Sequence, residues 1–299
     1  MNIKRVNDDF YNIVGNGLLS EFIPYLRPFY YHKELQLKSI NKKYLSILKS
    51  QFQQHKNTYS DGLIRDFTDS VIWSQQEAIK EDASLSKYFK DDNLMMAVSD
   101  LFLAATDTSQ TTLRWMVLLM ANYPDLQQRM FQEITDAIGD RMPVQEDKSN
   151  LPFTCAFIKE TLRFRTAAPI GLDHESGVDS SIGGYTIPKR TRILFYHHHQ
   201  NHDEKYWKNP SQFDPERFIE NGKLKVEREK SFVSFGLGKR SCIGERMAYT
   251  NLMLILVGLI QKLKFELPDG PGSANLEPIN VLISSLPRDY QIICSKRMF

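Results

Sequence analysis

A ten-residue segment rich in glycine, residues 235–244, constrains this chain more than any other part of its sequence. Gly236 and Gly238 allow a tight turn in which the backbone comes close to a flat partner. Cys242 directly precedes a stretch that we expect to be helical, and the positive end of a helix dipole stabilises a thiolate. Arg240 adds a fixed cation suited to a carboxylate. The segment therefore indicates a thiolate held against a planar, carboxylate-bearing partner.

These residue types together suit one axial iron ligand, a planar macrocycle and an anchor for a propionate group. Gly244 removes a side chain at the point where the following helix would meet that partner. The alternative is a structural cysteine buried in a Gly-rich turn. We prefer this alternative for Cys155 and Cys294, because neither lies in such a setting.

Composition excludes several broad classes of protein. The 38 basic and 36 acidic residues give a formal charge of +2, too small for a broad nucleic-acid surface. Hydrophobic residues make up 41% of the 299 residues, which is too many for a disordered chain. The three cysteines form no disulfide framework, so we expect a reducing compartment. The longest apolar run, Leu252–Ile260, is far shorter than the ~20 residues that span a bilayer.

Hydrophobic periodicity and helix start and stop signals predict a mainly α chain with small β-sheets. Helices are expected at 37–54, 62–80, 93–122, 124–139, 152–164 and 244–264. Short strands are expected at 181–189 and 192–196, and a terminal hairpin from 281–283 and 290–294. Pro24 and Pro28 favour a loop or a helix end in the aromatic stretch 23–31, as a packed connection or a membrane-touching loop. One compact unit is predicted.

Three further motifs carry information. Glu160 and Arg163 lie three residues apart on a predicted helix, so they can pair, although most such pairs are solvated surface contacts. Residues 215–218, Pro-Glu-Arg-Phe, belong to a meander that contains proline and aromatic residues. The long helix contains the polar run 104–109, in which a threonine can bond to the carbonyl four residues earlier. A solvated kink is the alternative for that run.

With Cys242 in the place of the axial ligand, these motifs resemble the cytochrome P450 family in type, order and spacing. Residues 62–70, 178–185 and 209–218 are most similar to an animal microsomal, family-2-like branch with xenobiotic-oxidising and steroid-hydroxylating members. The resemblance implies the C-terminal portion of the fold: a long central helix over haem, the cysteine-ligand loop and a terminal β-hairpin. It implies a single domain over 1–299 without the N-terminal anchor, the strands and the haem-gripping helix of the family.

The resemblance also implies a cofactor and the residues that hold it. The cofactor is haem b, iron protoporphyrin IX, with Cys242 as the axial ligand of the iron. The implied haem contacts are Phe235, Gly236, Arg240, Cys242, Gly244, His174 and Ala105. His174 is alternatively an ordinary surface histidine. The family usually has glycine in the place of Ala105, and we expect the extra methyl group to tune activity rather than abolish it.

Other residues receive roles in catalysis, structure and substrate binding by the same resemblance. Asp107 and Thr108 are implied to deliver protons during oxygen activation. Glu160, Arg163 and Arg217 are implied to form a buried structural network near the thiolate. The implied substrate contacts are Asp100, Ala104, Ala168, Ile170, Leu172, Ile283 and Leu286. The alternative for the apolar members of this set is that they are core residues.

The implied activity is insertion of one oxygen atom from O2 into a lipophilic organic substrate, such as a steroid, a fatty acid or a xenobiotic. The alternative is a truncated haem-binding or inactive fragment without turnover. The implied partners are an NADPH-dependent flavoprotein reductase and cytochrome b5, with no nucleic acid. Lys208, Lys239 and Arg246 would suit a basic docking face. The implied location is the cytosolic face of the endoplasmic reticulum membrane.

The run His197-His198-His199 suggests a metal ion. We expect a strand here, and neighbouring side chains on a strand point to opposite faces, so His197 and His199 at most converge. A carboxylate at zinc-ligand spacing is missing, so a metal site is the weaker hypothesis. His202 more simply caps local structure.

Overall fold

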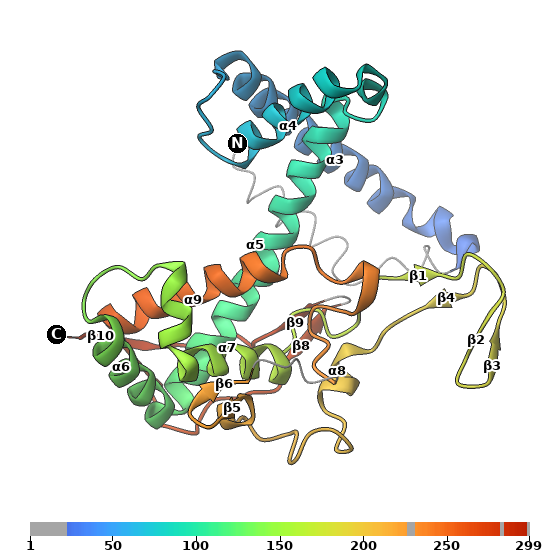
Figure 1. Ribbon diagram of the computed structural model, residues 1–299. Helices are drawn as coiled ribbons and strands as arrows, with labels where there is room; N and C mark the ends of the chain where they lie inside the picture. Colours follow the sequence, from blue (N-terminus) through green and yellow to red (C-terminus); the bar gives the residue numbers. More distant parts are fainter. Residues whose placement is uncertain (1–22, 226–230, 282–283, 298–299) are drawn as a thin grey trace. The chain divides into compact units, whose positions relative to one another are not determined.

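The structure is a computed structural model that describes residues 23–225, 231–281 and 284–297 (Figure 1). The chain divides into two compact units, Met1–Thr106 and Asp107–Phe299. The division falls inside α5 (Asp91–Asn122), a continuous helix of 32 residues. That both units belong to a single domain over 1–299 stays a prediction. Helices dominate the described part of the chain, in agreement with the predicted mainly α class.

The first unit contains α3 (Arg27–Thr58), α4 (Phe67–Glu81) and the first turns of α5. The two prolines of the aromatic stretch mark a helix start: a 3₁₀ turn, Pro24–Leu26, leads into α3, and Pro28 lies in its first turn. A proline is tolerated there because the N–H groups of the first turn have no acceptor within the helix, so the N–H that proline lacks costs no hydrogen bond. A second 3₁₀ turn, Ala83–Lys87, follows α4. The core of this unit consists of Tyr44, Leu48, Phe52, Ile72, Leu94 and Met95.

The second unit is built on the later turns of α5 and on three further long helices, α6 (Pro124–Ile138), α7 (Pro152–Phe164) and α9 (Glu245–Lys262). Proline stands at the start of α6 and of α7, as the sequence predicts. Trp115, Phe157 and Leu256 are among the fully buried side chains of the core between these helices. Short 3₁₀ turns cover Gln145–Asn150, Pro215–Phe218 and Gly238–Arg240.

The strands of the second unit form small antiparallel pairs (Figure 1). The pairs are β1 (His174–Glu175) with β4 (Arg192–Ile193), β2 (Ser180–Ile182) with β3 (Tyr185–Ile187), β5 (Ile219–Glu220) with β6 (Lys223–Leu224), β7 (Leu263–Glu266) with β10 (Ile293–Lys296), and β8 (Ile279–Val281) with β9 (Ser284–Leu286). The predicted hairpin of 281–283 with 290–294 is therefore wrong in its pairing. A hairpin does form, from β8 and β9, while β10 pairs with the strand that leaves α9.

The predicted strand at 192–196 is also too long. Its partner β1 has only two residues, so the pairing ends at Ile193. The chain then forms a short helix, α8 (His197–Asn201), which replaces the strand geometry expected for the histidine run. Sequence periodicity misses this helix because five residues are too few to show a period.

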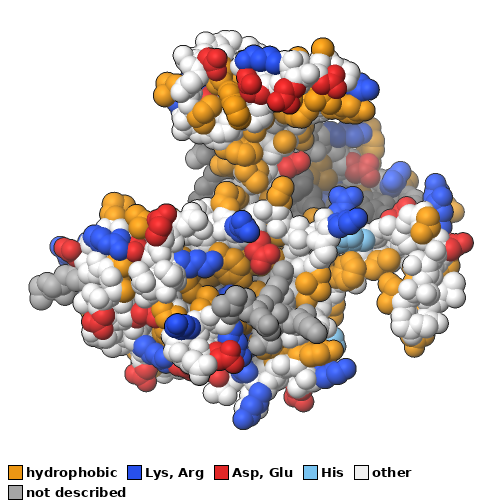
Figure 2. Space-filling view, viewed as in Figure 1, with side chains coloured by type: hydrophobic (Ala, Val, Ile, Leu, Met, Phe, Trp, Pro, Cys, Tyr) orange, Lys and Arg blue, Asp and Glu red, His pale blue; other side chains and the backbone are white. Residues whose placement is uncertain are grey.

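None of the helices in the described part of the chain combines the length and the apolar character that crossing a bilayer requires. Lysine and arginine are interspersed with aspartate and glutamate over the face drawn in Figure 2. This mixture agrees with the small formal charge of +2.

Candidate functional site

The Gly-rich segment folds into a tight turn that presents Cys242 in front of α9. The amide of Cys242 donates to the carbonyl of Phe235 at 2.8 Å, which closes the turn. Gly236 and Gly238 each have φ of +71°, a left-handed conformation that other residues rarely adopt. The helix begins at Glu245 with Gly244 as its N-cap. Local backbone geometry therefore fixes the place of the sulfur just before the N-terminus of α9.

The surroundings of this sulfur fit a flat apolar group that carries iron. Cys242 is exposed, and so are the neighbouring Leu237 (58%) and Ile243 (95%). A Cβ atom at Gly244 would lie 3.8 Å from the sulfur, in contact with it, so glycine keeps that side of the thiol open. Arg240 is exposed on the same turn, where it can meet a carboxylate. An uncovered thiol among uncovered apolar side chains suits axial ligation of a macrocycle.

Cys155 provides the contrast. It is buried on α7, and burial raises the pKa of its thiol to about 11. A thiol with this pKa stays protonated at neutral pH, and the thiolate is the form that binds metals. Cys155 is therefore a structural residue, as its setting in the sequence predicts. Cys294 is exposed on β10, away from any helix start.

Glu160, Arg163 and Arg217 meet in the second unit. The guanidinium of Arg163 grips the Glu160 carboxylate with Nε and an NH2 group, each at 2.7 Å, and both side chains are fully buried. The Nε atom of Arg217 lies 3.4 Å from Oε1 of the same carboxylate. Its other donors reach the carbonyls of Lys208, Asn209 and Gln212. Burial raises the pKa of Glu160, and the neighbouring arginines oppose that rise. The pair thus fastens the 209–218 meander to α7.

Sequence reasoning missed Asn201, which connects this network to the cysteine turn. Asn201 is fully buried at the end of α8, and its carbonyl accepts from Arg163 at 2.8 Å. Its amide group donates to the hydroxyls of Thr166 and Ser234, and its side-chain oxygen accepts from the amide of Val233. Val233 in turn accepts from Gly236, the first glycine of the turn. The available signal was a single asparagine beside the histidine run, which is too weak to read alone.

The polar run of α5 lies in an unbroken helix. Thr106 and Thr112 donate to the carbonyls of residues four positions earlier, Phe102 and Thr108, at 2.7 and 2.8 Å. Thr108 itself is exposed. The Oδ2 atom of Asp107 is buried and has no hydrogen-bond partner among the described residues. A buried carboxylate oxygen without a partner is costly. The predicted role of Asp107 in proton delivery stays a prediction.

A sequence model described as Cytochrome P450 matches residues 2–293. The chain belongs to the cytochrome P450 family. Among its relatives, cytochrome P450 1A1 of Pleuronectes platessa is 37% identical over 89% of this chain and 51% of that protein. The protein of the same name from Chelon auratus is 37% identical over 91% of this chain and 53% of its own length. That from Limanda limanda is 38% identical over 88% and 51%.

The relatives give no support to the predicted family-2-like branch, because those compared carry the name cytochrome P450 1A1. This P450 chain spans about half the length of the curated relatives that it matches. Members of the cytochrome P450 family bind haem, and the turn of Cys242 has the chemistry that such a group requires.

The predicted substrate residues of this P450 fall on different elements. Asp100 and Ala104 stand exposed on α5 within the first unit, where the predicted haem contact Ala105 also lies. Ala168 and Ile170 are half-buried after α7, and Leu172 is 74% exposed. Leu286 is half-buried at the end of β9. Ile283 lies outside the described residues.

His174 belongs to the first strand pair. Its Nδ1 atom is 2.8 Å from the carbonyl of Leu172, and its ring meets Phe195 edge-on with centroids 5.1 Å apart. The half-buried ring is therefore held by residues that flank its strand pair. Its predicted contact with a haem propionate stays a prediction.

One residue of the histidine run, His198, makes a tilted ring contact with His202. The ring centroids of His198 on α8 and of His202, the C-cap of that helix, lie 4.1 Å apart, and Nδ1 of His197 lies 3.3 Å from the carbonyl of Ala168. Burial lowers the pKa of all three, that of His202 to about 4. The predicted strand, on which His197 and His199 at most could converge, is wrong: these residues are helical, and residues two apart on a helix face different ways.

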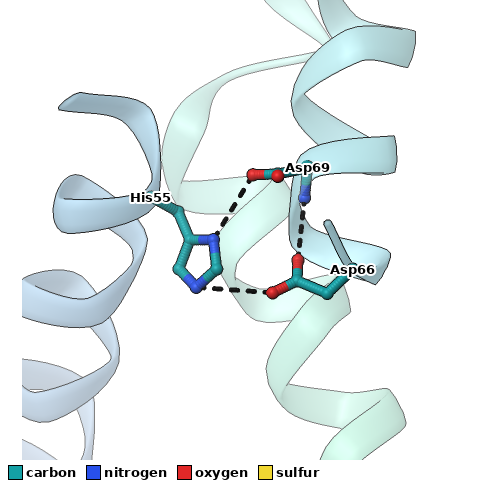
Figure 3. Close-up of side chains that lie close together, drawn as sticks. All are labelled: His55, Asp66 and Asp69. Atoms are coloured by element: carbon teal, nitrogen blue, oxygen red, sulfur yellow. Dashed lines mark hydrogen bonds and ion pairs between the residues drawn. The ribbon is translucent and has the colours of Figure 1, made fainter. Parts of the chain in front are cut away.

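Metal-ligand atoms converge at one place in the described ranges: His55, Asp66 and Asp69, near the start of α4 (Figure 3). Each ring nitrogen of His55 faces its own carboxylate, Nδ1 at 3.4 Å from Asp69 and Nε2 at 3.7 Å from Asp66. The guanidinium of Arg65 donates to both carboxylate oxygens of the buried Asp69, at 2.6 and 2.8 Å. This contact strongly lowers the pKa of Asp69. The three side chains are better suited to joining α3 to the start of α4 than to binding a metal ion.

Proposed function

We propose that this chain belongs to a haem-dependent monooxygenase in which Cys242 is the axial ligand of the iron. The observation that carries the proposal is the exposed thiol, held by the glycine turn at the N-terminus of α9 and surrounded by uncovered apolar side chains. Bound haem b would supply the activation of O2, with a thiolate that donates electron density to the iron. Phe235, Gly236 and Gly244 would leave room for the ring, and Arg240 would pair with a propionate.

Asp107 and Thr108 would move protons on the substrate side of the site. Asp107 has a buried carboxylate oxygen without a partner among the described residues, and Thr108 is exposed on the adjacent position of α5. A carboxylic acid beside a hydroxyl can pass protons from solvent to a reacting oxygen. Ala105, in the place of the usual glycine, would narrow the neighbouring space by one methyl group.

The substrate would be a lipophilic organic molecule, such as a steroid, a fatty acid or a xenobiotic. Within the second unit Ala168, Ile170, Leu172 and Leu286 are small or aliphatic, which suits an apolar ligand. Asp100 and Ala104 are further predicted contacts, and Asp100 would bind a polar group.

Electrons would come from NADPH through a flavoprotein reductase, with cytochrome b5 as a second donor. Lys208, Lys239 and Arg246 are exposed and offer positive charge to an acidic partner. A reductase of this kind acts at the endoplasmic reticulum membrane, and we propose its cytosolic face as the location of the protein.

The test is the absorption spectrum of the reduced, haem-loaded protein under carbon monoxide. A thiolate ligand gives the red-shifted Soret band that is characteristic of this family, and Cys242→Ser should abolish that band. Cys294→Ser is the matched control, because Cys294 is also exposed but lies on β10. If Cys242→Ser kept the red-shifted band, the ligand assignment would be wrong. NADPH consumption with a hydroxylated product would separate a monooxygenase from a haem-binding protein without turnover.

A further inference from the structure

One buried hydrogen bond joins α5 to the β8–β9 hairpin. Trp115 is fully buried on α5, and its indole Nε1 donates to the carbonyl of Ser285 at 2.8 Å. Ser285 is 4% exposed in the middle of β9. Because an indole N–H has a single direction, this bond fixes both the distance and the orientation of the strand against the helix.

Ser285 directs both of its main-chain polar groups away from the hairpin. Its carbonyl accepts from Trp115, and its amide donates to the carbonyl of Ala167 at 3.1 Å. In an antiparallel pair, alternate residues turn these groups outward. Ser285 therefore ties β9 to two segments at once: α5 and the stretch that follows α7.

Two further contacts hold the chain on either side of the hairpin. Before it, the buried guanidinium of Arg165 donates to the carbonyl of Leu276 at 2.9 Å and lies 5.5 Å from the ring of Trp115. After it, the hydroxyl of Tyr290 donates to the carbonyl of Arg114 at 2.7 Å. The hairpin is thus anchored to adjacent residues of α5 at its middle and at its exit.

The anchors stand next to predicted substrate contacts. Leu286 directly follows Ser285, and Ala168 directly follows Ala167. Trp115 comes seven residues after Thr108 on α5, so the two share a helix face, roughly 10 Å apart along the axis. We propose that Trp115 is a positioning residue, which sets the place of β9 relative to Thr108 and so determines how far an apolar substrate can extend. This inference rests on the function proposed above.

The experiment measures the binding of 1-alkylimidazoles, from methyl to octyl, to the haem-loaded protein by the shift of its Soret band. The ring nitrogen binds iron in every member, while the alkyl chain probes the apolar walls. In the wild type each buried methylene should tighten binding about fourfold. In Trp115→Phe, the carbonyl of Ser285 loses its donor. We expect the ratio of the affinity for 1-octylimidazole to that for 1-methylimidazole to fall at least about 15-fold, as if about two methylenes were no longer buried.

Three comparisons make the result decisive. The affinity for 1-methylimidazole should change less than about twofold, because that ligand does not reach the hairpin. Trp207→Phe is the matched control: Trp207 is also buried and donates its indole N–H to a carbonyl, that of Gln200, but outside the hairpin. In Trp207→Phe, binding should tighten along the alkyl series as much as it does in the wild type. Tyr290→Phe removes a milder contact of the same hairpin and should act in the direction of Trp115→Phe, with a smaller effect.

If binding to Trp115→Phe tightens along the alkyl series as much as it does in the wild type, the inference is overturned, whatever the result for Tyr290→Phe. If Trp115→Phe fails to fold, Tyr290→Phe decides alone. If the wild-type protein gives no Soret shift with 1-methylimidazole, the proposed function itself fails, and this outcome differs from an altered alkyl series on an intact iron site.

Discussion

Glu160 and Arg163 illustrate how burial changes the worth of an ion pair. Both side chains are fully buried, whereas most pairs three residues apart on a helix are solvated. Arg163→Leu should lower the free energy of unfolding by about 3–5 kcal/mol, because Glu160 would keep a buried charge without its bidentate partner. Urea denaturation measures this loss. The matched control is Lys80→Leu, which breaks the exposed pair with Glu77 at the same spacing and should cost at most about 0.5 kcal/mol. A cost below about 1 kcal/mol for Arg163→Leu would contradict the argument.

His202 links stability to pH at the same scale. Burial and the nearby His198 and Arg163 hold the pKa of His202 at about 4, below the ordinary value of 6.5. Between these two values the unfolded chain binds a proton that the folded protein does not, so stability should fall as the pH drops from 7 to 4. Because the ring is only partly buried, we expect His202 to account for about 1–2 kcal/mol of this loss. Unfolding of His202→Gln should depend less on pH in this window, and an unchanged slope would refute the assignment.

At the scale of elements, Asn201 joins α8, the end of α7 and the cysteine turn. Removing its side chain in Asn201→Ala would leave the amide of Val233 and two hydroxyls without their buried partner. We expect a loss of about 2–3 kcal/mol in unfolding free energy and faster release of haem, because the turn would lose its support. Transfer of haem to apomyoglobin measures the release rate. Asn93→Ala removes a hydrogen bond from an exposed asparagine and should leave the rate unchanged.

The cysteine turn and the strand partners differ in how far they could be predicted. The turn depends on glycine φ angles and on contacts between residues less than ten positions apart, so the sequence of residues 235–244 predicts the turn. The start of α7 at Pro152 is also predictable from local sequence, because proline is favoured in the first turn of a helix. The partner of β10 is not: Ile293 pairs with Glu266, and nothing within either short strand specifies the other. Pairing across such a separation is decided by the packing of the whole unit.

At the scale of the whole molecule, each unit has its own core. Leu48 is 7% exposed in the core of the first unit, and Leu256 is fully buried in that of the second. Leu48→Ala should cost about 2–5 kcal/mol and should raise amide hydrogen exchange in α3 and α4, while α7 and α9 stay protected. Leu256→Ala is the reciprocal variant and should raise exchange in α7 and α9. Equal loss of protection in all four helices of either variant would show that the units unfold together.

The sequence by itself determined the family, the glycine turn that presents Cys242, and most helix boundaries, because each depends on residues close together in the chain. Tertiary structure decided the rest: the pairing of β8 with β9, the helix in place of a strand at His197–Asn201, the bridge through Asn201 and the bond from Trp115 to Ser285. The bridge through Asn201 and the bond from Trp115 to Ser285 depend on partners far apart in sequence. A buried N–H or carbonyl must find a partner, and only the packed chain specifies which one lies within reach.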